Sequence, residues 1–259
     1  MEKINLGELH IMNNKNLADL DLYERHDVLS EIGMLADEEN IGQPERPYSE
    51  WSEEDFETVL ALFESWPYSD ASAPEFEHLT NAFEQHFNPT ILQDDDIKAI
   101  LEHTAQALSA AGKEAFGADA PDVVLDFISS PEAKGYYGGL RPDGKIQINS
   151  DKLNDMRVKG STFEGAESFI ELVSHEATHL FQNYCDDTCD VETEDLRLSI
   201  RVSMMFYEAT DGAKKAGHRE LYWQHPMEVQ ARDVAERLTS KISEQNPAPS
   251  VTEDNAFDL

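Results

Sequence analysis

The stretch Phe163–Tyr184, FEGAESFIELVSHEATHLFQNY, decides the fold that we expect for this chain. It contains the complete pattern H-E-x-x-H, as HEATH at positions 175–179. On a helix, residues four apart lie on the same face, so His175 and His179 can direct two imidazoles at one cation. Zn²⁺ accepts neutral imidazole nitrogens and keeps a position open for water in catalytic sites. Glu176, beside the first histidine, is placed to take a proton from that water.

The apolar residues around this motif predict a helix that is buried on one side. They recur at helical spacing and form one stripe, which comprises Ala166, Phe169, Ile170, Val173, Ala177, Leu180, Phe181 and Tyr184. At about 100° per residue, His175 and His179 lie nearly opposite this stripe. The alternative is a surface helix on which two histidines happen to fall at this spacing. Ser161 or Thr162 can cap the helix, and no proline interrupts it.

The chain is strongly acidic. Its 259 residues include 53 Asp and Glu against 20 Lys and Arg, which gives a formal net charge of −33. Such a surface repels phosphate backbones and anionic lipids, so we expect neither nucleic acid nor a membrane surface as a partner. A very soluble surface and a salt-adapted source both fit this charge, and a basic substrate or partner is compatible with it.

Compartment and redox state follow from what the sequence lacks. No stretch is long and apolar enough to span a membrane, and residues 1–14 carry no apolar signal core. We therefore expect a cytoplasmic protein, or one exported without a cleaved signal peptide. Two cysteines, Cys185 and Cys189, do not make a disulfide framework. Reduced thiols are the expected state; a local disulfide or a second metal site are the alternatives.

Patterning divides the chain into three segments. Residues 1–120 have the pattern of helices joined by acidic loops, and we interpret them as a helical lobe. Residues 121–242 carry the strands and the H-E-x-x-H helix, and we expect them to form the catalytic domain. Residues 243–259 contain two prolines and no periodicity, which predicts a disordered tail.

The strands of the second segment are short. The run Val123–Ile128 predicts a buried strand, and Pro142-Asp143-Gly144 between two extended runs predicts a hairpin. The second strand of the hairpin is Lys145–Asn149. The first lies in Lys134–Leu140 and is rich in glycine, which suits an edge that another backbone can approach closely. A loose loop is an equally good interpretation of the glycine-rich run.

Beyond the motif helix, we expect a loop over Cys185–Val191 and then a helix over Thr193–Thr210 that ends at Asp211-Gly212. The core stripe of that helix consists of Leu196, Ile200, Met204 and Tyr207. Pro226 suits the first position of a last helix. Glu228 falls in its first turn, beside the apolar stripe, and is the best third ligand, although the helix dipole alone also favours a carboxylate there. The competing candidates are His218, His225, Asp190 and Asp233.

A strand hairpin, an H-E-x-x-H helix and a later P-x-E-x-x-A helix (Pro226–Ala231) together resemble gluzincin-type zinc metallopeptidases, in the style of the bacterial and phage enzymes. The resemblance covers about residues 122–242. It implies an α+β zincin-like domain, with a small mixed sheet beside the active-site helix, next to the N-terminal helical lobe. It also implies a protein or peptide substrate and Zn²⁺ as the cofactor.

The resemblance implies a role for each site residue. The zinc ligands correspond to His175, His179 and Glu228, and the general base corresponds to Glu176. The substrate-binding edge strand corresponds to Lys134–Gly139, including Tyr136, Tyr137, Gly138 and Gly139. Besides the metal, the developing oxyanion needs a hydrogen-bond donor. Tyr222 is the preferred candidate and His225 the second, although Tyr222 could equally be a packing aromatic beside Trp223. Two other classes of protein stay open: a non-catalytic zinc-containing binding protein, and a helical interaction protein with an accidental motif.

Overall fold

The structure is a computed structural model that describes residues 17–35, 44–93, 96–129, 137–158, 162–189 and 196–245. It is mostly helical and contains a small three-stranded mixed sheet, in agreement with an α+β class. The elements are the short 3₁₀ helices η1 (Leu17–Asp19), η2 (Tyr48–Glu50) and η3 (Pro89–Gln93), the strands β1 (Val124–Ile128), β2 (Gly138–Leu140) and β3 (Lys145–Asn149), and the helices α2 (Leu22–Ile32), α3 (Glu53–Glu64), α4 (Pro74–His86), α5 (Ile97–Phe116), α6 (Ser150–Val158), α7 (Thr162–Asp187), α8 (Leu196–Ala216), α9 (Arg219–Trp223) and α10 (Pro226–Gln245).

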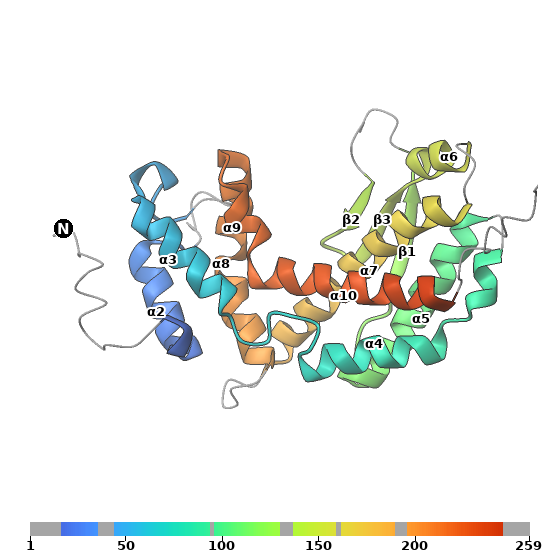
Figure 1. The fold of residues 1–259 in the computed structure, drawn as a ribbon, viewed down its shortest axis with the longest axis horizontal. Coiled ribbons are helices and arrows are strands. Elements are labelled where there is room, and N and C mark those ends of the chain that lie inside the picture. Colours follow the sequence, from blue (N-terminus) through green and yellow to red (C-terminus); the bar gives the residue numbers. More distant parts are fainter. Residues whose placement is uncertain are drawn as a thin grey trace, which may run out of the picture.

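The helices gather around two apolar cores, which Figure 1 shows as two groups joined by α8 and α10. In one core, α2 and α3 pack against α8 and α9, with Leu62 and Phe206 completely buried. In the other, α4 and α5 pack with α7, α10 and the sheet, around Phe83 and Phe181. The helices expected as one lobe over residues 1–120 are thus distributed over both cores, because α2 and α3 find their apolar partner far along the chain.

The sheet has the strand order β1-β3-β2, in which β1 is parallel and β2 antiparallel to β3. The predicted hairpin is confirmed: β2 and β3 are joined by a tight turn in which the N–H of Gly144 donates to the carbonyl of Arg141. The strand predicted at Val123–Ile128 is present as β1, but the prediction that it is buried is wrong. β1 lies at the edge of the sheet, where Val124 is 45% exposed and the other strand residues are half-buried.

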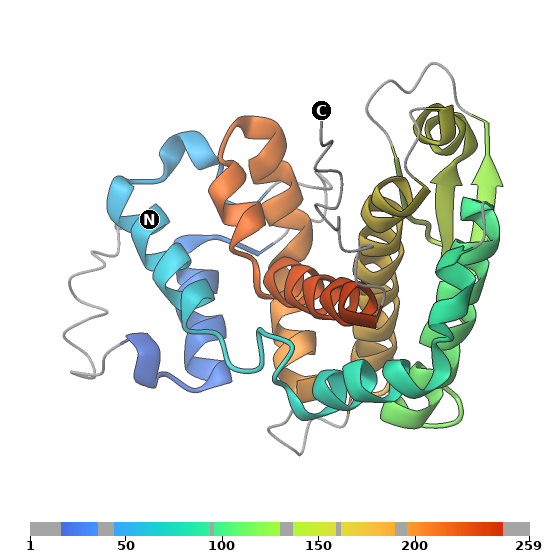
Figure 2. The same ribbon diagram turned by 45° about the vertical axis from the view of Figure 1, so that its right-hand side comes forward.

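The helix α7 is the centre of the second core. Of its predicted apolar stripe, six residues are buried, namely Phe169, Ile170, Val173, Ala177, Leu180 and Phe181. Gly112 on α5 allows close packing, because a Cβ atom there would lie 2.4 Å from the ring of Phe181. The helix α10 runs antiparallel to α7, since Gln182 contacts Gln230 near the beginning of α10 and Glu167 contacts Ser243 near its end. Figure 2 shows α10 nearly end-on beside α7.

Three helices extend further than the sequence predicted. The helix α7 continues to Asp187, so Cys185 is a buried helical thiol rather than a loop residue, while Cys189 follows the helix. The helix α8 passes through Asp211-Gly212 because Ala213 is buried in the first core, and it ends before Gly217, which has a φ of 103°. The helix α10 includes residues 243–245 of the expected tail; residues 246–259 lie outside the described part. Among the described helices, none is both long and apolar enough to cross a membrane.

Candidate metal centre

His175, His179 and Glu228 come together where α7 meets the first turn of α10. The Nε2 atoms of the two imidazoles are 3.1 Å apart. The Glu228 carboxylate lies 3.5 Å from Nε2 of His175 and 3.3 Å from Nε2 of His179. In the part of the chain that the structure describes, these side chains form the group of His, Cys, Asp or Glu that could hold a metal ion.

The donor set fits a tetrahedral zinc ion. With ligand bonds of about 2.0–2.2 Å, two ligands of a tetrahedral zinc are about 3.3–3.5 Å apart. The two imidazole nitrogens are 3.1 Å apart, Oε1 of Glu228 lies 3.3 Å from Nε2 of His179, and Oε2 lies 3.5 Å from Nε2 of His175. With one ligand atom taken from each residue, the three atoms lie within 4.8 Å of one another. Two imidazole nitrogens and one carboxylate also form a donor set that leaves a fourth position open. The three residues could therefore hold a metal ion, and their donor atoms are of the kind that Zn²⁺ accepts.

Burial and charge shift the pKa values of Glu228 and His179 in ways that stabilise the two side chains next to each other. Glu228 is 1% exposed, and burial raises the pKa of its carboxyl group. Hydrogen bonds from His175, His179 and Tyr207 outweigh burial and hold this pKa well below its ordinary value. Burial also lowers the pKa of His179, but hydrogen bonding to Glu228 and its charge outweigh that effect and leave the pKa raised. Glu228 and His179 therefore each favour the charged form of the other, and a cation bound between them would also compensate the buried carboxylate.

Two tyrosines border this centre. The hydroxyl of Tyr207 on α8 donates a hydrogen bond of 2.6 Å to Oε1 of Glu228. The ring of Tyr222 on α9 lies 6.3 Å from that of Tyr207, between centroids. Burial, followed by the charge of Glu228, raises the pKa of Tyr222, and the nearby charge of Glu176 contributes to the same effect. The charges of both carboxylates thus favour the protonated hydroxyl of Tyr222. Tyr207 was expected only as a core residue of its helix, and no sequence signal separated it from its apolar neighbours.

Glu176 is tied to the sheet. Its Oε2 atom accepts a hydrogen bond of 2.8 Å from the backbone N–H of Leu140 in β2. In this antiparallel pair, Tyr137 and Arg141 hydrogen-bond to β3, so residues 137, 139 and 141 direct their backbone groups toward β3. Residues 138 and 140 direct theirs away from it. The carboxylate of Glu176 therefore accepts a hydrogen bond from Leu140, one of the residues of the edge strand β2 whose backbone N–H faces away from β3.

The other residues of the predicted substrate strand take different positions. Gly138 presents its N–H and C=O away from β3, whereas those of Gly139 face β3. Tyr137 is 45% exposed, and its ring contacts Phe169 at a centroid distance of 5.9 Å. Tyr136 lies outside the described residues.

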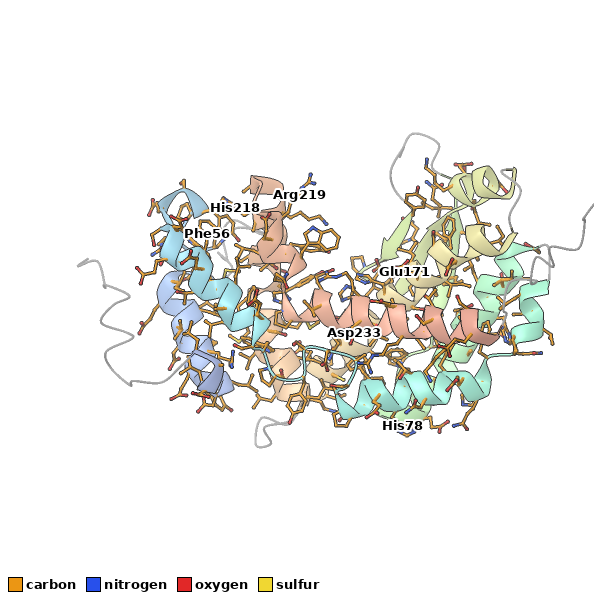
Figure 3. The ribbon with its side chains drawn as sticks, in the orientation of Figure 1. Phe56, His78, Glu171, His218, Arg219 and Asp233 are labelled. Atoms are coloured by element: carbon orange, nitrogen blue, oxygen red, sulfur yellow. The ribbon has the colours of Figure 1, made fainter. Side chains whose placement is uncertain are left out.

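The alternative third ligands are held elsewhere. His218 stacks on Phe56 at 4.5 Å, at the far end of α9 (Figure 3). His225 is completely buried, with Nε2 3.1 Å from the carbonyl of Ser203, and burial lowers its pKa to about 3. Asp233 accepts a hydrogen bond from the N–H of Ala71. Asp190 lies outside the described residues. Both ring nitrogens of His225 contact backbone groups, so His225 is not placed to donate a hydrogen bond to a substrate oxyanion, the role for which it was the second candidate.

An acidic hollow of about 670 Å³ lies along the same two helices. Four carboxylates and four hydroxyls line it, from Glu167, Glu171, Glu236, Glu244, Ser168, Thr239, Ser240 and Ser243. Glu171 (Figure 3) precedes His175 by one helical turn, so this hollow begins close to the metal cluster. Its lining favours cationic over anionic groups.

Comparisons with known protein families, with curated proteins and with solved structures find no match to this chain.

Proposed function

We propose that this chain is a zinc-dependent peptidase of the gluzincin type, with His175, His179 and Glu228 as metal ligands and Glu176 as general base. The observation that supports this most directly is the donor set itself, in which two imidazole nitrogens 3.1 Å apart lie 3.3 and 3.5 Å from the two carboxylate oxygens of Glu228. When bound there, Zn²⁺ would supply an activated water and polarise a carbonyl group. A donor set of this kind with one open position is typical of catalytic rather than structural zinc.

Glu176 is the proton carrier in this proposal. It accepts a proton from the attacking water and passes it to the leaving amine. The bond from Leu140 fixes Oε2, so the rotation of the carboxylate is restricted and Oε1 is left for the reaction. Preorganised groups of this kind lose little freedom at the moment of reaction.

Tyr222 is the donor for the developing negative charge on the substrate oxygen. Its raised pKa keeps its hydroxyl protonated, as a hydrogen-bond donor must be. Its position near both Glu228 and Glu176 supports this role.

An extended peptide is the substrate that fits the edge strand. Gly138 offers one backbone donor and one acceptor away from β3, and β-strand addition uses such groups. The acidic hollow beside the cluster favours peptides with Lys or Arg near the scissile bond. Libraries rich in basic residues are therefore the first substrates to assay.

The test is a comparison of Glu176→Gln with wild type. The variant should bind zinc with wild-type stoichiometry but lose more than about 99% of its turnover on peptides that wild type cleaves, since removal of a general base costs about 10²–10⁴-fold. Glu208→Gln, an exposed carboxylate on α8, is the control and should stay active. Near-normal hydrolysis by zinc-loaded Glu176→Gln would remove Glu176 as the base.

Metal content separates the remaining classes of protein. Glu228→Ala should lose zinc in competition with a chelator, whereas His218→Ala should retain it. A wild-type protein that takes up no zinc would indicate a helical interaction protein. Stoichiometric zinc without hydrolysis of any library would indicate a non-catalytic binding protein.

A further inference from the structure

The second nitrogen of His179 begins a chain of buried hydrogen bonds. Its Nδ1 lies 2.7 Å from Oε1 of Gln182, which is completely buried. The amide nitrogen of Gln182 lies 3.0 Å from the carbonyl oxygen of Met227 and 2.9 Å from Oε1 of Gln230. The amide nitrogen of Gln230, 1% exposed, lies 2.6 Å from the carbonyl oxygen of Tyr68. The chain thus connects the metal ligand to the segment between α3 and α4.

The ends of this chain fix its polarity. A backbone carbonyl can only accept, so the Gln230 amide must point its NH₂ group at Tyr68 and its oxygen at Gln182. The NH₂ group of Gln182 must then face Gln230, and the carbonyl of Met227 imposes the same orientation independently. The oxygen of Gln182 is left for His179, whose Nδ1 must therefore donate. A neutral imidazole with its proton on Nδ1 carries its lone pair on Nε2. That nitrogen faces His175 and Glu228.

The segment at the outer end of this series of hydrogen bonds contacts α10 at two points. Tyr68 has a φ of 58°, a conformation that residues other than glycine seldom adopt. The same segment is bound again where Asp233 Oδ2 accepts a bond of 2.7 Å from the N–H of Ala71. In Figure 3, Asp233 lies on the side of α10 that faces this segment. Two separate contacts thus keep residues 68–71 in register with α10.

We propose that Gln182, Gln230 and the backbone carbonyl of Tyr68 form a positioning chain that selects the Nδ1–H tautomer of His179 and aims its Nε2 at the cation. The proposal rests on the metal site of the proposed function and does not depend on peptide hydrolysis. Partners of this kind orient metal-binding histidines and raise their basicity. Here the orientation originates at a strained backbone residue outside the helices that carry the ligands.

The test measures the tautomer and the metal affinity separately. In metal-free protein at alkaline pH, two-bond ¹⁵N–¹H correlations should show the proton of His179 on Nδ1. In Gln182→Leu that preference should be lost, and zinc affinity from chelator competition should fall about 10–100-fold. Gln182→Glu retains the acceptor for His179 but loses the donor to Met227 and Gln230, so it should be less stable than wild type, keep the Nδ1–H tautomer and bind zinc more tightly than Gln182→Leu. Gln230→Leu should show a smaller loss of affinity, because Met227 still orients Gln182.

The control is Thr178→Val. Thr178 is completely buried on the same helix, and its hydroxyl bonds only within that helix, to the carbonyl of Ser174. It should keep the wild-type tautomer and affinity. If Gln182→Leu showed the wild-type tautomer and the wild-type zinc affinity, the proposal would be overturned. If Gln182→Leu did not fold, Gln230→Leu would decide instead, and a wild-type tautomer and zinc affinity in that variant would overturn the proposal. Zinc binding with the Nδ1–H tautomer but without hydrolysis would leave the positioning chain standing and remove the peptidase.

Discussion

At the residue scale, the hydroxyl of Tyr207 donates a hydrogen bond to Glu228, the proposed third ligand, from outside the two helices that carry the cluster. Tyr207→Phe removes this donor and leaves the buried carboxylate of Glu228 with one bond fewer. A hydrogen bond to a charged group contributes about 1.5–3 kcal/mol, so we expect a loss of that order in the stability of the metal-free protein. Zinc affinity should fall about 10–100-fold, as for other groups that orient a metal ligand. Denaturant unfolding and chelator competition measure the two effects.

A matched control is Tyr48→Phe. Tyr48 is also buried, and its hydroxyl donates to the carbonyl of Ala209 on the same helix as Tyr207. This variant should lose stability and keep wild-type zinc affinity. Equal weakening of zinc binding in both variants would mean that Tyr207 acts only by stabilising α8.

Local geometry explains which site residues could be predicted. His175, Glu176 and His179 occupy one turn of one helix, so their spacing alone places the two imidazoles together. Glu228 could be proposed from its place in a helix opened by Pro226, but the contact with α7 depends on how α10 packs. Tyr207 and Gln182 could not be found. Each lies on a largely buried helix face, and only the packing of α8 and α10 gives its polar end a partner.

At the element scale, the hairpin depends on the close approach of β2 to β3 and α7. A Cβ atom on Gly138 would lie 2.2 Å from the carbonyl oxygen of Gln147 and 2.9 Å from a methyl group of Leu172. Gly138→Ala should therefore cost about 1–3 kcal/mol of stability, as overpacking does. Since the closer contact is with backbone, adding Leu172→Ala should not restore it. Recovery in the double variant would locate the strain in Leu172 instead.

The elements also show where sequence patterns are insufficient. The hairpin was predictable because Pro142-Asp143-Gly144 sets the turn locally. The end of α8 was not, because Asp211-Gly212 is a local stop signal that burial of Ala213 overrides. Similarly, the apolar run of β1 indicates a strand but not its place in the sheet.

At the scale of the whole molecule, pH should change stability in opposite ways with and without zinc. The raised pKa of His179 contributes stability that is complete below about pH 6.5 and is lost as pH rises through the folded-state pKa. The lowered pKa of Glu228 contributes stability above about pH 4.3 that is lost as pH falls through its folded-state value. Between about pH 4.3 and about pH 6.5, the metal-free protein therefore has both stabilising contributions, from His179 and from Glu228. Zinc needs neutral imidazoles, so the increase in Tm on adding zinc should grow from pH 6 to pH 8.5.

Glu228→Gln isolates this effect from the titration of the many surface carboxylates. Its metal-free form should lack the part of the pH dependence that comes from the pair with His179. An equal zinc-induced increase in Tm at both pH values would contradict the assignment of His179 as a ligand.

The division into two cores could not be predicted, for a similar physical reason. The stripes on α2 and α3 show which faces are apolar, but not that their partner is α8, which begins more than a hundred residues later. Pairing over such distances depends on the whole chain rather than on any local pattern. A lobe composed of successive helices was the simplest interpretation, and the packing divides those helices instead.

The placement of Glu228 on α10 has a consequence for biosynthesis. Glu228 follows His179 by 49 positions (228 − 179). A growing polypeptide therefore contains both imidazoles before the carboxylate of Glu228 or the amide of Gln230 has been made. At that stage a metal ion would meet only two of the three proposed ligands. If the protein binds zinc as proposed, selective uptake would follow the docking of α10, and an ion acquired earlier would remain exchangeable until that helix packs against α7.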